Sequence, residues 1–253
     1  MKKILEVKQL NKKYSIDGNR NYHVLKNIDL EINEGEFVSV MGPSGSGKST
    51  LLYNISGMDQ MSSGSVKINS KEISCMKEVA LAKIRLNEIG FIFQQSNLLR
   101  NLNLLDNIIL SAYLAKCESK KTINKRVFEL MEKMGISDIA THYITESSGG
   151  QLQRVSICRA LINNPNIIFA DEPTGALNLK STEEVMQILL NINRDGTTIM
   201  LVTHDVKVAA KTERVLFMVD GEIVSEIQLG KLRNDDLKAR EEKLLKWLSI
   251  LGF

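Results

Sequence analysis

A glycine-rich stretch at residues 42–50 constrains the fold of this chain more than any other feature. Its residues are Gly42, Pro43, Ser44, Gly45, Ser46, Gly47, Lys48, Ser49 and Thr50. They fit the pattern G-x-x-x-x-G-K-[ST], which is typical of a phosphate-binding loop. The apolar run at 36–41 predicts a buried strand before the loop, and residues 49–55 predict a helix after it. This context favours a phosphate-binding loop over a Gly/Ser surface turn that matches by accident.

Each residue type in this stretch has a mechanical role in binding phosphate. Glycines let backbone N–H groups approach an anion closely, next to the N-terminus of a helix. Lys48 brings a full positive charge to the β- and γ-phosphates, and the hydroxyl of Ser49 is a ligand that Mg²⁺ accepts. The stretch therefore predicts a site for the phosphates of a nucleotide and for Mg²⁺.

The composition is that of an ordinary globular chain. It has 253 residues, of which 43% are apolar and 25% charged, enough for a sizeable core in one or two domains. The net charge of +3 is too small to argue for a nucleic-acid partner. The sequence has no apolar run of about 18 residues and no apolar stretch after its basic start, so it predicts neither a membrane span nor a signal peptide. We expect the chain in the cytoplasm.

Hydrophobic periodicity predicts strands that alternate with helices. The predicted strands are either apolar or alternate with period two, and they cover residues 5–10, 28–32, 36–41, 64–68, 89–93, 166–170, 197–202 and 214–219. The predicted helices have apolar residues at helical spacing and cover residues 49–55, 104–134 (in two apolar stripes), 181–193 and 206–211. This alternation argues for a mostly parallel sheet, interrupted by a helical insertion at roughly 95–158.

A second motif places two carboxylates at the end of a strand. The apolar residues 167–170 are followed directly by Asp171 and Glu172, and ligands of α/β sheets bind at the carboxyl ends of strands. Asp171 suits Mg²⁺, directly or through water. Glu172 suits orienting and deprotonating an attacking water. An acidic turn without this role is the alternative, but the phosphate-binding loop in the same chain favours the functional interpretation.

A third motif opens a predicted helix with the sequence Ser147, Ser148, Gly149, Gly150 and Gln151. A hydroxyl and two glycines at a helix N-terminus form a second anion site, and an ordinary serine N-cap is the alternative. Two phosphate sites in one chain raise the question of whether two chains share a single site.

Together the motifs resemble the nucleotide-binding ATPase of ABC transporters over nearly all of residues 2–230. Residues 42–50 match Walker A and residues 167–172 match Walker B. Residues 147–151 match the LSGGQ signature, with serine in place of the first leucine. The resemblance implies an α/β P-loop NTPase of the ABC type, with a RecA-like β/α core, an N-terminal antiparallel β region and an inserted α-helical subdomain.

The resemblance also implies roles for single residues. Gln94 matches the Q-loop glutamine that senses the γ-phosphate, His204 matches the switch histidine, and Tyr14 matches the aromatic residue that stacks on adenine. Residues 175–178 match the D-loop, with Asn178 where aspartate is usual. The implied cofactors are ATP and Mg²⁺. The implied metal ligands are Ser49, Gln94 and Asp171, and the implied catalytic residues are Glu172, His204 and Gln94.

The implied organisation is a single ATPase domain at 1–230. Residues 1–94 and 159–230 form the β-subdomain and P-loop core, and 95–158 form the helical subdomain with the signature. The tail, 231–253, is predicted as an amphipathic helix that packs on its own domain, with contact to a partner or a second ATPase as the alternative.

In the family, two copies face head to tail, and each ATP lies between the Walker A of one copy and the signature of the other. The resemblance therefore implies a dimer that closes on ATP and drives a separate integral membrane permease. The chain would then lie at the cytoplasmic face of the cell membrane, held there by the permease.

Residues 85–94 and 97–99 resemble the lipoprotein-releasing and macrolide-exporter-like ATPases. This subgroup includes Gram-positive transporters for resistance to antimicrobial peptides such as bacitracin and lantibiotics, some of which associate with a sensor histidine kinase. The alternative is a non-transport ABC ATPase that regulates a membrane partner in cell division or signalling. DNA-repair ATPases need long coiled coils and translation-factor ATPases need two cassettes, and the sequence has neither.

Overall fold

The computed structural model describes residues 2–16, 20–233 and 236–253. The elements in these ranges follow one another as β1 (Lys3–Ile16), β2 (Arg20–Asn33), β3 (Phe37–Met41), α1 (Lys48–Ile55), β4 (Ser63–Ile68), β5 (Lys71–Glu72), α2 (Glu78–Asn87), β6 (Ile89–Ile92), α3 (Leu104–Ala115), α4 (Lys120–Lys133), η1 (Ser137–Ile139), η2 (Ile144–Glu146), α5 (Gly149–Leu161), β7 (Ile167–Asp171), α6 (Leu179–Arg194), β8 (Thr198–Val202), α7 (Val206–Ala209), β9 (Arg214–Val219), β10 (Glu222–Gln228) and α8 (Leu237–Ile250).

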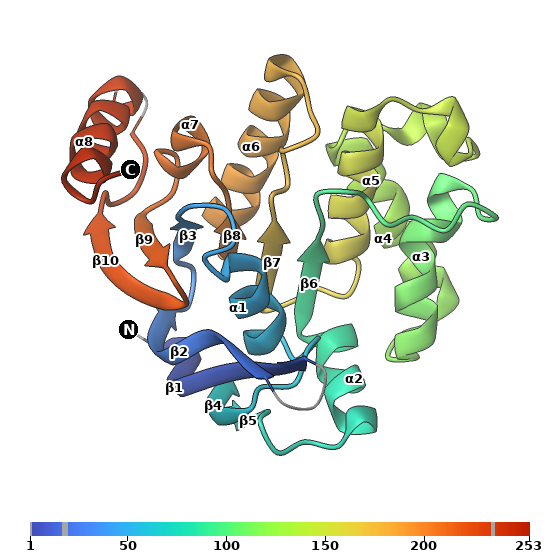
Figure 1. Cartoon of the computed structure of the whole chain (residues 1–253). Helices are drawn as coiled ribbons and strands as arrows, with labels where there is room; N and C mark the ends of the chain where they lie inside the picture. Colours follow the sequence, from blue (N-terminus) through green and yellow to red (C-terminus); the bar gives the residue numbers. More distant parts are fainter. Residues whose placement is uncertain (1, 17–19, 234–235) are drawn as a thin grey trace.

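The strands form two sheets (Figure 1). The larger sheet has the order β10-β9-β3-β8-β7-β6, and all its strands run parallel except β10. The smaller sheet has the order β2-β1-β4-β5 and is antiparallel. Both sheets confirm the predicted α/β fold, with a mostly parallel core and an antiparallel region near the N-terminus.

Helix α1 lies between the two sheets (Figure 1). Its side chains Leu51, Leu52 and Ile55 are fully buried. They share one core with apolar residues of both sheets, among them Val7 of β1 and Val40 of β3. Because each buried side chain of this size stabilises the fold by about 1.5–3 kcal/mol, the core fixes α1, and the loop before it, to both sheets.

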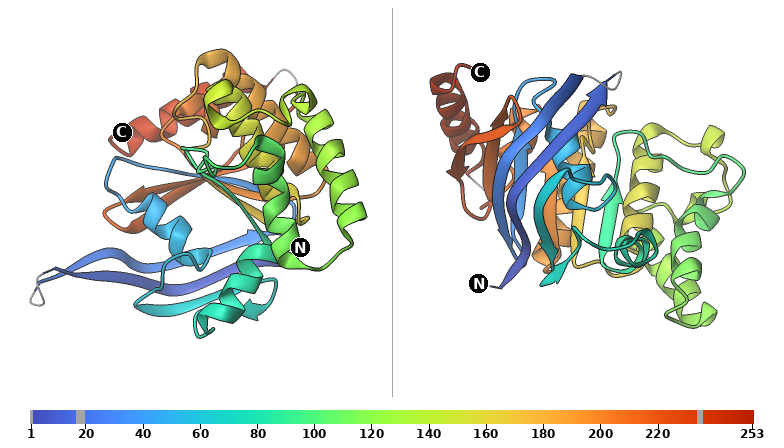
Figure 2. Two further views of the ribbon diagram at one scale, coloured as in Figure 1. Left: turned by 90° about the vertical axis from the view of Figure 1, so that its right-hand side faces the viewer. Right: turned by 60° about the horizontal axis from the view of Figure 1, so that its bottom comes forward.

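Helices α3, α4 and α5 form a group beside the edge strand β6 (Figures 1 and 2). The two apolar stripes predicted at 104–134 belong to separate helices. Lys116 takes a positive φ of 54° after α3, and Ser119 caps α4 by accepting a hydrogen bond from the backbone N–H of Thr122. Helix α5 continues to Leu161, beyond the end of the helical insertion expected at 158. The predicted domain boundaries stay a prediction.

The sequence analysis missed α2 and β10, together with the short elements β5, η1 and η2, and it predicted β1 and β2 too short. Only Ile84 of α2 is buried, so this helix has no apolar stripe that periodicity could detect. Edge strand β10 has no fully buried residue. Strands β1 and β2 pair from Lys3 with Asn33 to Ile16 with Arg20, well beyond the predicted 5–10 and 28–32, because polar residues make up much of the outer part of this hairpin.

Helix α8 packs against β9 and α7. Leu244 and Leu248 are buried in a cluster with Phe217, and Trp247 approaches the Phe217 ring edge-on with 5.9 Å between centroids. Through these contacts α8 packs on the rest of the chain. The helix begins at Leu237, and residues 234–235 of the predicted tail lie outside the described ranges. None of the described helices is long and apolar enough to cross a bilayer.

Candidate functional site

The loop between β3 and α1 has a backbone conformation that depends on glycine. Gly42, Gly45 and Gly47 have φ values of +148°, +80° and +97°, which side-chain-bearing residues rarely adopt. A Cβ on Gly42 would lie 2.0 Å from the carbonyl oxygen of Met218, so only glycine fits there. The loop ends at the N-terminus of α1, where backbone N–H groups lack partners within the helix and suit an anion.

Lys48 is the first residue of α1 and is buried. Its Nζ donates hydrogen bonds to the carbonyl oxygens of Gly42 at 2.9 Å and Pro43 at 2.8 Å. Burial lowers the pKa of Lys48, while the nearby charges of Glu172 and Asp171 act in the opposite direction. Because the two carbonyl partners carry no net charge, the positive charge of this ammonium stays available for an anion.

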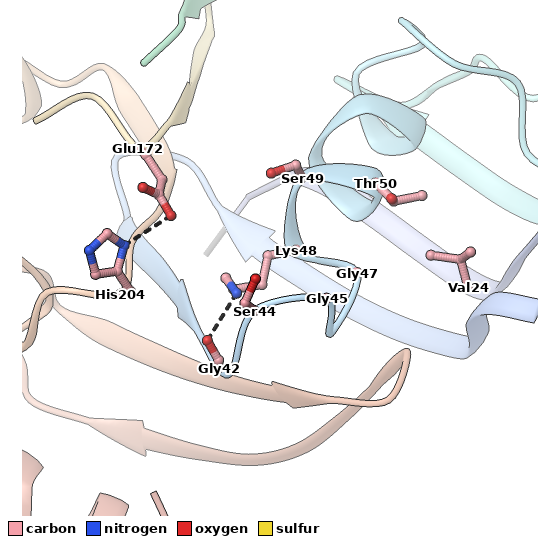
Figure 3. Close-up of a pocket in the computed structure, with 10 residues that line it drawn as sticks. All are labelled: Val24, Gly42, Ser44, Gly45, Gly47, Lys48, Ser49, Thr50, Glu172 and His204. Atoms are coloured by element: carbon pink, nitrogen blue, oxygen red, sulfur yellow. Dashed lines mark hydrogen bonds and ion pairs between the residues drawn. The ribbon is translucent and has the colours of Figure 1, made fainter. Parts of the chain in front are cut away.

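A pocket of about 530 Å³ opens over this loop (Figure 3). The residues that line it come from β2, the loop, α1 and the ends of two central strands: Val24, Gly42, Ser44, Gly45, Gly47, Lys48, Ser49, Thr50, Glu172 and His204. The volume lies in the range of small-molecule sites. Two of the predicted catalytic residues, Glu172 and His204, therefore share a pocket with the predicted phosphate-binding loop.

Glu172 and His204 follow the adjacent parallel strands β7 and β8. The carboxyl ends of such strands meet at one edge of the sheet, which brings the two side chains together. His204 Nδ1 lies 3.0 Å from Glu172 Oε1. Glu172 has a positive φ of 45°, which is uncommon for a residue with a side chain, and its backbone N–H donates to the Val202 carbonyl at 3.0 Å.

Asp171 is held by two hydroxyl groups of α1. Ser49 Oγ donates to Asp171 Oδ1 at 2.9 Å, and the Tyr53 hydroxyl donates to Oδ2 at 2.7 Å. Burial and this hydrogen bond raise the pKa of Tyr53. The sequence analysis missed Tyr53, although its i,i+4 spacing from Ser49 places both residues on one face of the helix. The hydroxyl of Ser49 and the carboxylate of Asp171 are hard oxygen donors, which fit Mg²⁺.

Gln94 follows β6 and approaches the same edge of the sheet. A Cβ built on Gly175 would lie 3.0 Å from both Gln94 Nε2 and Glu172 Oε2, so Gln94 and Glu172 flank the same glycine. Gln94 does not line the pocket described above.

Ser148, Gly149, Gly150 and Gln151 begin helix α5. Ser148 is its N-cap, and Gln151 Oε1 accepts a hydrogen bond from the Ser148 N–H at 2.8 Å, which completes a capping box. None of these residues lines the described pocket. Tyr14, on β1, is also outside the lining; it is 41% exposed. Within one chain, the structure therefore joins the phosphate-binding loop to Glu172 and His204 but not to the signature.

Comparison with known proteins identifies the relatives of this chain. Residues 25–175 match the family model described as ABC transporter. The chain is 43% identical over 250 residues to the bacitracin export ATP-binding protein BceA of Halalkalibacterium halodurans, covering 98% of this chain and 97% of BceA. It is 44% identical over 231 residues to the macrolide export ATP-binding/permease protein MacB of Aggregatibacter actinomycetemcomitans, covering 91% of this chain but only 36% of MacB.

A solved structure shows the same architecture. It is the dimeric, post-hydrolysis state of the ATP-binding cassette MJ0796 bound to ADP and Pi, which has a TM-score of 0.83 and 42% identity, and covers 90% of this chain and 100% of that one. Identity at this level over nearly the whole chain, together with the match to the family model, confirms the relationship that the motifs indicated. The chain therefore belongs to the ABC transporter family, as an ATP-binding subunit with the fold of an ATP-hydrolysing cassette.

Proposed function

We propose that this chain binds ATP with Mg²⁺ between two copies of itself, and that hydrolysis drives a separate permease in resistance to antimicrobial peptides. The observation that carries the proposal is the shared pocket of Lys48, Glu172 and His204. A buried lysine and a carboxylate–imidazole pair line the same cavity, and this arrangement supports binding and hydrolysis of a nucleotide there.

The site residues divide the chemistry among them. The loop 42–50 and Lys48 bind the phosphates, Glu172 accepts the proton of the attacking water, and His204 contacts the γ-phosphate. Ser49 and Asp171 would hold Mg²⁺, with Gln94 as a further ligand. Bound Mg²⁺ would neutralise charge on the phosphate oxygens. Tyr14 offers its ring to the adenine.

A second copy of the chain supplies the signature. Ser148, Gly149, Gly150 and Gln151 begin a helix whose N-terminus suits an anion, yet they lie outside the pocket of their own chain. A head-to-tail pair resolves this, because each signature then faces the pocket of the other copy. The dimeric state in which MJ0796 was solved supports such a pair.

The relatives support a membrane permease as partner. MacB is named as an ATP-binding protein and permease in one chain, and this chain corresponds to 36% of it. BceA, which this chain matches over nearly its full length, is named for bacitracin export. We infer a location at the cytoplasmic face of the membrane through the permease, and a sensor histidine kinase that associates with the same permease.

Deletion of the gene, followed by complementation, tests this function. Loss of the chain should increase susceptibility to bacitracin or a lantibiotic. Wild-type protein should restore resistance and Lys48→Ala should not. Unchanged susceptibility, with co-purification of the chain and a membrane protein of cell division or signalling, would favour the alternative of a regulator that transports nothing.

A further inference from the structure

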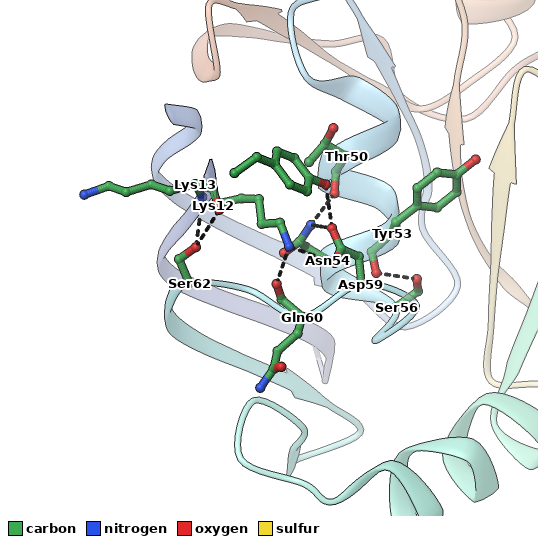
Figure 4. Close-up of polar contacts among 10 residues, drawn as sticks. Lys12, Lys13, Thr50, Tyr53, Asn54, Ser56, Asp59, Gln60 and Ser62 are labelled. Atoms are coloured by element: carbon green, nitrogen blue, oxygen red, sulfur yellow. Dashed lines mark hydrogen bonds and ion pairs between the residues drawn. The ribbon is translucent and has the colours of Figure 1, made fainter. Parts of the chain in front are cut away.

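A charged cluster joins strand β1 to the segment that follows α1 (Figure 4). Its centre is Lys12, which is only 7% exposed. Lys12 Nζ donates to Asp59 Oδ1 at 2.7 Å and to the carbonyl oxygen of Gln60 at 2.6 Å. A buried ammonium needs such partners, because an unpaired charge away from water is costly. Neither Lys12 nor Asp59 has a role in the chemistry proposed above.

The same pair of charges holds the side chain of Tyr14. The Tyr14 hydroxyl donates to Asp59 Oδ2 at 2.6 Å. Lys12 Nζ lies 4.5 Å from the centroid of the Tyr14 ring, close enough for a cation–π contact on one face. Lys12 and Asp59 thus restrain the ring at its hydroxyl and on one face, while 41% of the residue stays exposed.

The cluster is also tied to the helix that carries the phosphate-binding loop. Asn54 of α1 is fully buried, and its Nδ2 donates to the Thr50 carbonyl at 2.9 Å and to Asp59 Oδ2 at 3.4 Å. Ser62 Oγ accepts a hydrogen bond from the backbone N–H of Lys13 at 2.8 Å. The segment 59–62 therefore links the far end of α1 to the part of β1 that carries Tyr14.

The charge states support this arrangement. Burial opposes ionisation of Asp59, but the hydrogen bonds from Lys12 and Tyr14 outweigh it and hold the pKa of Asp59 below its ordinary value. Burial and the hydrogen bond to Asp59 raise the pKa of Tyr14 to about 12. At neutral pH the carboxylate is charged and the phenol is a neutral donor, so the contact persists.

We propose that Asp59 and Lys12 are positioning residues that fix the Tyr14 ring relative to the phosphate-binding loop, so that its open face receives the base of the nucleotide. The inference rests on the proposed function, in which residues 42–50 bind the phosphates. Holding the ring in advance reduces the ordering cost of binding. Losing the restraint forfeits only part of the stacking between the ring and the base, so it should weaken ATP binding by about three- to tenfold.

Calorimetric titration of the full chain with ATP and with inorganic triphosphate tests the proposal, with Mg²⁺ omitted to prevent hydrolysis. Triphosphate occupies the loop but has no base. Asp59→Ala and Lys12→Met should each weaken ATP binding by about three- to tenfold and leave triphosphate binding unchanged. The matched control is Lys3→Met, which removes the exposed ion pair of Lys3 with Glu31, 2.8 Å long, from the same strand. It should alter neither affinity.

A double-mutant cycle sharpens the test. In a Tyr14→Ala background, Asp59→Ala should cause no further loss of ATP affinity, because the ring that it positions is gone. An unchanged ATP affinity of Asp59→Ala, an equal loss for ATP and triphosphate, or an additive loss in the Tyr14→Ala background would each overturn the positioning role.

Two controls separate failure of the positioning role from failure of the proposed function and from misfolding of a variant. The first is the wild-type titration: a wild-type chain that binds neither ATP nor triphosphate would contradict the proposed function itself. The second is thermal unfolding of each variant, which shows whether it folds. If Asp59→Ala does not fold, Tyr14→Phe, which removes only the hydroxyl, carries the test. It should weaken ATP binding by a few-fold with triphosphate unaffected, and an unchanged ATP affinity would again overturn the proposal.

Discussion

The imidazole of His204 lies 3.0 Å from the carboxylate of Glu172, measured from Nδ1 to Oε1. The contact follows from the parallel pairing of β7 and β8, whose carboxyl ends bring the two residues to the same pocket. It restrains one oxygen of the carboxylate beside the phosphate-binding loop. A carboxylate restrained in this way is suited to accept a proton from a water that attacks a phosphate.

Glu172→Gln should therefore bind ATP but hydrolyse it about 10²-fold more slowly or worse, because an amide cannot act as the base. Single-turnover hydrolysis and equilibrium ATP binding measure the two effects separately. The variant should also accumulate as an ATP-bound dimer in size-exclusion chromatography with light scattering. Glu242→Gln, an exposed change on α8, is the control. Near-normal turnover with intact ATP binding would remove Glu172 from this role.

Lys48→Ala should abolish ATP binding without unfolding the chain. At about 4 Å, a lysine charge and a phosphate charge attract each other by roughly 4 kcal/mol at an effective dielectric near 20, and the carbonyl partners of Lys48 do not replace that charge. Equilibrium binding and thermal unfolding check the two parts of this prediction. The exposed Lys207→Ala should bind ATP normally, and unchanged affinity in Lys48→Ala would contradict the phosphate-loop assignment.

The parts of the fold that the sequence predicted are those with local signals. Buried strands such as β7, the glycine-rich loop and the carboxylates at a strand end are contiguous in sequence, so periodicity and motif spacing detect them. Helix α2 gave no such signal because Ile84 is its one buried residue. The outer part of the β1–β2 hairpin is stabilised by cross-strand pairing, which is not visible in either strand alone.

The site likewise combines residues that local sequence patterns predict with residues that only the packing of the chain brings together. The pocket joins Lys48 to Glu172 and His204, which all belong to motifs, but it also contains Val24, which belongs to none. The contact between Lys12 and Asp59 joins residues 47 positions apart. Such pairings depend on how sheets and helices pack, so spacing alone cannot predict them. Tyr53 is an exception to this limit, because its i,i+4 spacing from Ser49 predicts that both residues lie on one face of the helix.

Arg240→Ala should destabilise the chain by about 3 kcal/mol, because this buried guanidinium satisfies several backbone carbonyls at once. Arg240 is 5% exposed and donates to the carbonyl oxygens of Ala210, Thr212, Leu229 and Gly230. At this chain length the midpoint of thermal unfolding should fall by about 6–12 °C. Far-UV circular dichroism measures the thermal unfolding of the whole chain.

Fluorescence of Trp247, the single tryptophan, separately reports whether α8 detaches first. The exposed Lys238→Ala on the same helix should shift the midpoint little, since it breaks no buried contact. An Arg240→Ala midpoint equal to that of Lys238→Ala would show that the four carbonyl contacts add nothing to stability.

Asn178→Asp should raise ATP hydrolysis by a few-fold. Asn178 is the N-cap of α6, where its Oδ1 accepts a hydrogen bond from the Ser181 N–H at 2.9 Å. Aspartate caps a helix equally well, so the change should leave the fold intact and add a charge next to residues 175–177. In the proposed dimer that charge orders the facing phosphate-binding loop, and a few-fold gain corresponds to about 1 kcal/mol of barrier.

Steady-state hydrolysis of both proteins with their permease measures the gain from this charge. Asn178→Ser keeps a capping oxygen without a charge and should show no gain in hydrolysis. This variant therefore distinguishes the effect of the added charge from the effect of changing the N-cap residue. Equal or lower activity in Asn178→Asp, with unfolding temperatures matched to wild type, would mean that the asparagine is neutral here. The charge would then have no part in communication between the two copies.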